Sequence, residues 1–325
     1  MDIEQGARII AEDWLHVERE KVFHFITDET KLREADAFVK AVELGGGVAK
    51  VTVLNSAQIQ DGESIEAMRE IMSYADVIVG ATNYSFITTN AVQYALRHGA
   101  KFLSLPLSTN DGSSLLENDF LLMDPREAAR LARPAVRRLN RANAIHVATA
   151  LGTDLTVSKR GRRAFYFNGV TSRPGAFASA SFEVCVPIVE TSATGKMVLD
   201  GSLGYLGLVE APLELEFEDG YLKRIGDTPD GRRLRAYLLS FDDLEMTCAA
   251  EFGIGLNQKA KCRGVAYIED ESAYGTFHIG FGRNLALGGV HDAAGHFDLV
   301  VHAPTITAGT RTVMKNGEFC RFYRS

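Results

Sequence analysis

Side chains that can bind a divalent metal ion are concentrated between residues 251 and 298. Within this region His296, Phe297 and Asp298 form an H-x-D motif that continues into an apolar run. On a β-strand, residues two apart point to the same face, so the imidazole and the carboxylate can bind one ion. The H-x-D motif is therefore the first candidate for a metal site.

Three further residues of ligand type accompany this motif. Glu251 and His278 stand beside glycine-rich segments, EFGIG and FHIGFG, and Glu183 begins the apolar run EVCVPIV. Imidazole nitrogen and carboxylate oxygen suit zinc, manganese, cobalt or iron(II), and several carboxylates can share two ions. Two neighbouring ions can lower the pKa of a bound water and polarise a carbonyl group, which is the chemistry of a hydrolase.

Each of these signals is weak when taken alone. H-x-D occurs often by chance, and a glutamate at a strand end more often faces solvent or caps the strand. An interpretation in which these polar residues only terminate strands therefore stays open. A closed structural metal site fits the pattern less well, because such sites are normally rich in cysteine or histidine.

The composition indicates a well-packed globular protein without a nucleic-acid or membrane partner. Hydrophobic residues make up 46% of the 325 residues, and the net charge is −7 with both signs mixed, so no basic binding surface is expected. No run of 18 apolar residues predicts a membrane span. The acidic N-terminus lacks the features of a secretion signal. Four scattered cysteines without a C-x-x-C pair favour a reduced, cytoplasmic protein.

The pattern of apolar residues predicts two domains. Residues 1–145 alternate strand-like runs with amphipathic segments, which predicts an α/β domain with a parallel sheet. Residues 146–325 contain short β-rich runs separated by glycine, which predicts a mostly β (α+β) domain with a hairpin at Asp219-Gly220. The first domain has neither G-x-G-x-x-G nor G-x-x-x-x-G-K-[ST]. We therefore expect it to be a scaffold, dimer surface or lid rather than a cofactor-binding domain.

Five segments, in this order and spacing, resemble the aminopeptidase T/aminopeptidase S family of metallopeptidases. The resemblance covers most of the chain at low similarity and is sharpest after residue 150. The segments are GTDL, EVCVPIVETSATG, AEFGIGLN, GTFHIGFG and HFDLVVHAPT. The resemblance implies an N-terminal α/β domain, a largely β catalytic domain, a homodimer and two divalent ions per chain, either zinc, cobalt, manganese or iron.

The resemblance also implies particular roles for individual residues. Glu251 would lie near both ions, and Glu271 resembles a further acidic position with shifted spacing. We expect Glu251 or Glu271 to act as the general base for a metal-activated water that attacks an amide bond in a short peptide or other small molecule. The implied metal ligands are Glu183, Glu251, His278, His296 and Asp298.

Two features depart from that family. Its peptidases carry a tyrosine seven residues after the histidine of the His278 motif, where this chain has Leu285. That tyrosine is thought to assist at the reacting carbonyl, so ordinary aminopeptidase turnover does not follow from the resemblance alone. The interval of 18 residues between His278 and His296 is also short, which suggests a trimmed substrate loop.

A second hypothesis comes from ring-cleaving dioxygenases of the same superfamily, which act on dihydroxypyridines with one Fe(II). Two histidines and one carboxylate bind such an ion and leave open positions, and His278, His296 and Asp298 could provide them. The resemblance implies that these dioxygenases have a histidine where Glu251 stands, and lack Glu183 and His278. The sequence thus favours a metal-dependent hydrolase, with the dioxygenase as the alternative.

Overall fold

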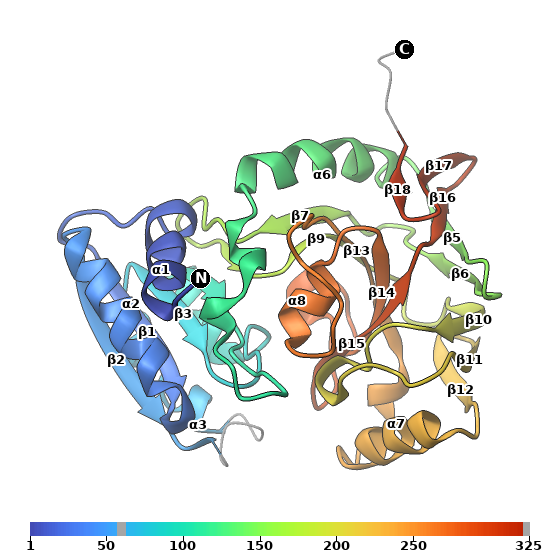
Figure 1. Ribbon diagram of the computed structural model, residues 1–325, viewed down its shortest axis with the longest axis horizontal. Helices are drawn as coiled ribbons and strands as arrows, with labels where there is room; N and C mark the ends of the chain where they lie inside the picture. The colour runs from blue at the N-terminus through green and yellow to red at the C-terminus, as the bar shows by residue number, and fades with distance from the viewer. Residues whose placement is uncertain (57–62, 321–325) are drawn as a thin grey trace. The chain divides into compact units, whose positions relative to one another are not determined.

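The computed structural model describes residues 1–56 and 63–320 (Figure 1). The chain forms two compact units. The first comprises Met1–Pro125 and Phe167–Ser181, and the second comprises Arg126–Tyr166 and the chain from Phe182 onward. This division differs from a single boundary at residue 145, because the chain returns to the first unit to add a strand. None of the described helices is long and apolar enough to cross a membrane.

The first unit is built on a parallel sheet, as the alternating pattern predicted. Its strand order is β2-β1-β3-β4-β8. The strands are β1 (Val22–Asp28), β2 (Val48–Leu54), β3 (Val77–Ala81), β4 (Lys101–Ser104) and β8 (Phe177–Ser179). The helices are α1 (Ile3–Ile9), α2 (Leu32–Leu44), α3 (Glu63–Glu66), α4 (Arg69–Met72) and α5 (Asn90–Arg97).

The central strands of this sheet are almost continuous apolar runs, as expected where both faces are covered. Every residue of β3 is buried. Helix α5 places Ala91, Val92, Ala95 and Leu96 on one face, and these residues pack with Ile78 and other buried side chains in one core cluster. Periodicity alone therefore accounts for this part of the fold.

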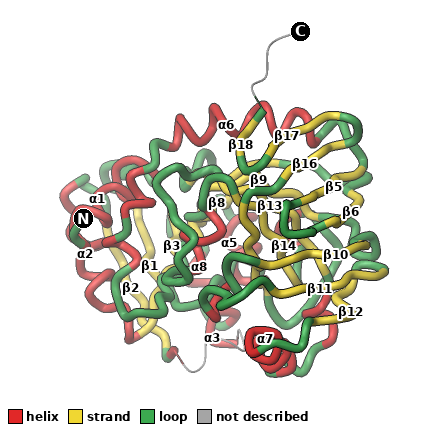
Figure 2. Tube along the Cα trace, turned by 45° about the vertical axis from the view of Figure 1, so that its right-hand side comes forward, coloured by secondary structure: helices red, strands yellow, loops and turns green. Residues whose placement is uncertain are grey.

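The second unit contains two further sheets (Figure 2). The larger has the order β12-β11-β10-β6-β5-β16-β17-β18. Its strands are β5 (Ala144–Ala148), β6 (Asp154–Ser158), β10 (Thr194–Leu199), β11 (Leu213–Glu218), β12 (Tyr221–Ile225), β16 (Thr305–Ala308), β17 (Arg311–Lys315) and β18 (Glu318–Phe319). The predicted hairpin is confirmed, since β11 and β12 pair antiparallel around Asp219-Gly220, both with positive φ.

The smaller sheet of the second unit carries the candidate site. Its order is β15-β14-β13-β9-β7. The strands are β7 (Phe165–Asn168), β9 (Phe182–Pro187), β13 (Ala249–Gly255), β14 (Thr276–Gly282) and β15 (His296–His302), and the helices of this unit are α6 (Pro125–Leu139), α7 (Pro229–Leu239) and α8 (Tyr267–Ser272).

Candidate metal centre

The smaller sheet of the second unit has one apolar face and one polar face. Its strands alternate, so residues two apart share a face. On the apolar face aromatic rings stack between strands, as Phe281 does with Phe297 at 5.2 Å between ring centroids. The opposite face carries all five metal ligands that the resemblance implied: Glu183, Glu251, His278, His296 and Asp298.

Glycines in the middle of two strands make room for these side chains. A Cβ atom on Gly253, which lies opposite His278 in the pairing of β13 with β14, would approach His278 Nε2 to 1.8 Å. A Cβ atom on Gly280 would approach Asp298 Oδ1 to 2.7 Å and Glu251 Cβ to 2.8 Å. These distances are shorter than real Cβ contacts, so an alanine at either position would force the polar side chains to move. The polar side chains therefore lie over backbone that has no side chain of its own.

A β-bulge in β13 gives Glu251 its direction. Ala249 lies opposite Phe281, but Glu251 lies opposite Gly280, so one extra residue is inserted between these two pairs. Without the extra residue, alternation would put Ala249 on the same face as Glu251. The bulge lets Ala249 follow the apolar face while Glu251 points to the polar one.

His296, Glu251 and Asp298 form one cluster. His296 Nε2 lies 3.1 Å from Glu251 Oε2 and 3.5 Å from Asp298 Oδ1. The other ring nitrogen, Nδ1, lies 2.9 Å from the carbonyl oxygen of Arg283 and donates to it when protonated. A backbone acceptor of this kind commonly orients metal-binding histidines, because it leaves Nε2 free to bind the ion.

A second cluster lies beside the first and shares Glu251. It consists of Glu183, Cys185 and Glu251, and one donor atom from each lies within 4.8 Å of the others; the same holds for Glu251, His296 and Asp298. His278 belongs to neither cluster, but its Nε2 lies 2.8 Å from Glu183 Oε2. The five predicted residues are thus brought together in one group on this face of the sheet, in which His278 contacts Glu183.

Helix α8 contributes a further carboxylate to the pocket. Of its three consecutive acidic residues, Glu269 pairs with Arg263 at 2.8 Å, and Asp270 accepts from the backbone nitrogens of residues 263 and 264. Glu271, in contrast, lies close enough to Asp298, Glu183 and Glu251 for their negative charges to raise its pKa. The expected role of Glu271 near the metals is therefore compatible with its position.

Tyr267 lies one helical turn before Glu271 and also contacts the group of acidic residues. Its hydroxyl donates to Asp298 Oδ2, and its ring stacks on Tyr205 with centroids 4.4 Å apart. Sequence reasoning missed Tyr267 and Cys185. Both could have been found by spacing, because Tyr267 precedes Glu271 by four residues on a helix and Cys185 follows Glu183 by two on a strand.

The buried charges in this pocket shift one another's pKa. Burial, with repulsion from Asp298, Glu183 and Glu251, raises the pKa of Glu271 well above its ordinary value. Burial likewise raises the pKa of Glu251, although His296 opposes the rise. Burial alone would lower the pKa of His278, but attraction to Glu183 overcomes it and raises the pKa to about 9. Without a cation, the pocket therefore retains protons to offset its negative charge.

The chemistry of these donors fits a divalent cation. Glu271 Oε2 and His278 Nδ1 are buried and have no hydrogen-bond partner among the described residues. Buried polar atoms are normally paired, so unpaired atoms beside several carboxylates indicate a missing positive group. Oxygen and nitrogen donors from Glu251, His296 and Asp298 suit iron, zinc, cobalt or manganese. The fold and the pocket together define a metal-binding enzyme.

Comparison with known proteins gives the family. Residues 17–321 match the family model of 2,5-dihydroxypyridine 5,6-dioxygenase (NicX), so the chain belongs to this family. No curated protein matches the chain in sequence. The match changes the balance between the two sequence-based hypotheses, because it supports the dioxygenase alternative better than the aminopeptidase-like hydrolase.

Two solved structures are similar over nearly the whole chain. The structure of 2,5-dihydroxypyridine dioxygenase from Pseudomonas putida KT2440 has a TM-score of 0.81 and 19% identity, and the match covers 98% of this chain and 96% of that one. Wild-type AmpT from Thermus thermophilus has a TM-score of 0.66 and 15% identity, with 98% of each chain covered. These similarities establish a fold shared by both groups of enzymes.

Proposed function

We propose that the protein is a metal-dependent dioxygenase that opens a hydroxylated, nitrogen-containing aromatic ring at a single iron(II) ion. The observation that carries this proposal is the family match over residues 17–321. The cluster of Glu251, His296 and Asp298, whose donor atoms lie close together, is the site that we propose for this ion. An open metal site of few protein ligands suits a reaction in which substrate and oxygen must both approach the ion.

The proposed iron ligands differ from the triad expected from sequence. That triad used His278, whereas the compact cluster has Glu251 in its place. The resemblance to dioxygenases implies a histidine at position 251, so this chain would bind iron through one imidazole and two carboxylates. The extra negative charge strengthens the attraction for the cation and favours a substrate that arrives without a negative charge of its own.

Neighbouring residues orient these ligands, and one of them can accept a proton from the substrate. The carbonyl oxygen of Arg283 fixes the ring of His296, and the hydroxyl of Tyr267 fixes Asp298. Glu271, whose pKa is raised, takes up the proton that a ring hydroxyl releases on binding. Bound iron supplies the one-electron chemistry with oxygen that these side chains lack.

The test is oxygen consumption by the iron-loaded protein. The purified chain is loaded with Fe(II) under nitrogen, mixed with 2,5-dihydroxypyridine and related hydroxypyridines, and followed by an oxygen electrode and by loss of ring absorbance. We expect uptake of one oxygen molecule per ring opened. The variants His296→Ala and Asp298→Ala should lose both bound iron and oxygen uptake.

Asp154→Ala is a matched control, because Asp154 forms an exposed pair with His146 at 2.8 Å in the same unit. This variant should keep full activity. Oxygen uptake that persists in Asp298→Ala after chelation, or its absence with every hydroxypyridine, would contradict the proposal.

A two-metal hydrolase is the second candidate, and one observation favours it. The cluster of Glu183, Cys185 and Glu251 lies next to the first cluster and shares a glutamate with it. Two ions there would activate a water for attack on an amide bond, with Glu271 as the general base. This reading predicts oxygen-independent release of amine from aminoacyl amides by protein loaded with two zinc, cobalt or manganese ions.

A further inference from the structure

Asn284 is a buried amide in the loop that joins β14 to β15, with an exposed fraction of 0%. Its Nδ2 donates to the carbonyl oxygen of Ala250 at 3.0 Å and to Glu190 Oε1 at 3.1 Å. Its Oδ1 accepts from the backbone nitrogen of His291 at 3.0 Å. With the amide turned over, its oxygen would face two acceptors, so only one orientation satisfies it. One side chain therefore joins three separate segments of the chain.

The segments joined by Asn284 stand directly beside two of the proposed metal ligands. Ala250 is the extra residue of the bulge in β13 and immediately precedes Glu251. Arg283, which immediately precedes Asn284, presents the carbonyl oxygen that orients the ring of His296. A displacement of Asn284 would therefore move the backbone next to Glu251 and the acceptor that holds His296.

Glu190 extends this arrangement to β9, the strand that carries Glu183. It follows the end of that strand closely, and its side chain is 12% exposed. Besides Asn284, its carboxylate accepts from the backbone nitrogen of Val290 at 2.9 Å and from Arg162 at 3.0 Å. Burial would raise the pKa of Glu190, but these hydrogen bonds and the charge of Arg162 lower it. Glu190 is therefore ionised near neutral pH and fixes the Asn284 amide from the side of β9.

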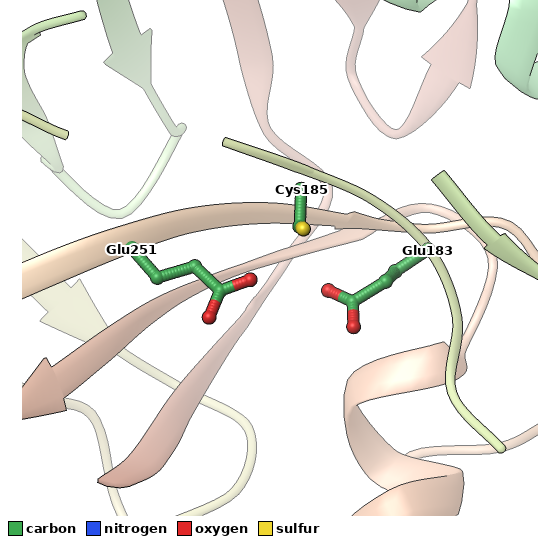
Figure 3. A group of neighbouring side chains, drawn as sticks. All are labelled: Glu183, Cys185 and Glu251. Carbon is green, nitrogen blue, oxygen red and sulfur yellow. The ribbon is translucent and has the colours of Figure 1, made fainter. Parts of the chain in front are cut away.

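The acids of the metal centre do not hold these strands in place by themselves. Figure 3 shows the carboxyl groups of Glu183 and Glu251 pointing toward each other, with the sulfur of Cys185 between them. Each acid pairs with a histidine, but Glu183 still repels Glu251. Contacts outside the cluster are therefore needed to keep the spacing of the strands. The loop packs closely enough to provide them, since a Cβ atom on Gly289 would approach Asn284 Oδ1 to 1.9 Å.

We propose that Asn284, held by Glu190, is a positioning residue for the metal centre. It sets the spacing between Glu251 and His296 and thereby determines the affinity for the metal. Its hydrogen bonds reach neither ligand directly, so it acts through the backbone beside each of them. The inference rests on the metal centre of the proposed function, but not on the reaction that takes place there.

The test compares zinc affinity with stability in Asn284→Ala. Metal-free, full-length protein is titrated with zinc against a chromophoric chelator, and urea unfolding in excess chelator gives the stability. We expect the zinc affinity to fall by about 10–100-fold. In the zinc-loaded wild type, the Nδ1 proton of His296 should give a downfield NMR signal that its hydrogen bond to the Arg283 carbonyl protects from exchange. In the variant this proton should exchange faster with water.

Asn140→Ala is the matched control. The amide of Asn140 also bridges to backbone, donating to the carbonyl oxygen of Ala164 at 3.0 Å and accepting from its nitrogen at 2.8 Å, but neither residue adjoins a metal ligand in the chain. This variant should lose stability while the zinc affinity and the His296 signal stay as in the wild type. Zinc affinity unchanged in Asn284→Ala, or lowered equally in both variants, would overturn the inference.

A second comparison keeps the test decisive if Asn284→Ala does not fold. Asn284→Asp keeps the size of the side chain but places a carboxylate against Glu190, so the zinc affinity should fall. Adding Glu190→Gln restores a donor between the two side chains and should recover part of the loss. No loss in the single variant, or no recovery in the double variant, would overturn the inference. None of these measurements uses oxygen, so a failed iron test would refute the dioxygenase and leave the positioning role standing.

Discussion

Two buried acidic residues, one in each compact unit, differ in how the protein satisfies them. In the first unit Asp28, at the end of β1, is fully buried and accepts from the backbone nitrogen and hydroxyl of Thr30 and from the backbone nitrogen of Asn83. In the second unit Glu271 is almost as buried, but its Oε2 has no hydrogen-bond partner among the described residues. Both oxygens of Asp28 accept hydrogen bonds, whereas one oxygen of Glu271 has no partner among the described residues.

Such a difference distinguishes an acid that the protein satisfies by itself from an acid that a ligand could satisfy. A carboxylate that receives several hydrogen bonds stabilises its own turn and has no need of a ligand. A carboxylate that is buried among other acids destabilises the fold until a cation arrives. Burial of charge alone would not distinguish the two units, whereas the hydrogen-bond partners do.

The largest contrast is expected from two glycines, one in each unit. Gly280→Ala would place a methyl group against Asp298 and His296, and should weaken metal binding by about 100-fold. Gly80→Ala in β3 would instead collide with the rings of Phe86 and Phe102, and should cost about 1–3 kcal/mol of stability without changing metal affinity. Metal titration and urea unfolding of both variants measure the two effects. Equal metal affinities in the two variants would show that Gly280 has no special role in metal binding.

Removing charge from each acid should sharpen the comparison. In metal-free protein, Asp28→Asn should lower the free energy of unfolding by about 1–3 kcal/mol, because an acceptor of several hydrogen bonds is replaced. Glu271→Gln should change it little or raise it, because it removes a buried acid that Asp298, Glu183 and Glu251 repel. Urea unfolding in the presence of a chelator checks both. A larger loss for Glu271→Gln would show that Glu271 is structural.

A smaller effect is expected at Tyr267. Tyr267→Phe keeps the ring that stacks on Tyr205 but removes the hydrogen bond to Asp298, so metal affinity should fall by about tenfold while the melting temperature of the metal-free protein stays nearly constant. Tyr221→Phe is the control, because its hydroxyl donates to the exposed Glu245 at 2.9 Å. Metal affinity unchanged in Tyr267→Phe would contradict a positioning role.

The smallest effect concerns acid stability of the first unit. Burial lowers the pKa of His24 to about 4, assisted by Lys50. The folded state thus binds fewer protons than the unfolded state between pH 4 and about 6.5, so stability should fall as the pH falls through this window. His24→Gln should flatten that part of the profile, as measured by thermal unfolding at a series of pH values. An unchanged slope would exclude His24 as a contributor.

The fold was predictable wherever local pattern determines structure. Apolar runs predicted strands β1 to β4, and the Asp219-Gly220 pair predicted the hairpin. Strand β8 was not predicted, because it has only three residues and its partner β4 lies more than seventy residues earlier in the chain. Pairing between such distant segments leaves no periodic signal near either of them.

The candidate site was predictable as a set of residues but not as two clusters. Spacing of two residues placed His296 and Asp298 on one face, and the resemblance added the others. The position of Cys185 between two acids depends on the pairing of β9 with β13, which spacing within one strand cannot give. The roles of Gly253 and Gly280 also appear only when neighbouring strands are aligned.

The bulge before Glu251 separates the register of the rest of β13 from that of the segment before it. Because the extra residue lies between Ala249 and Glu251, a one-residue insertion or deletion there shifts the segment upstream, including Leu244–Thr247, and leaves Glu251 opposite Gly280. The bulge can therefore absorb a change in length without altering the pairing of Glu251. The acidic residue that both clusters share thus owes its place to its own pairing with Gly280 rather than to the segment before the bulge.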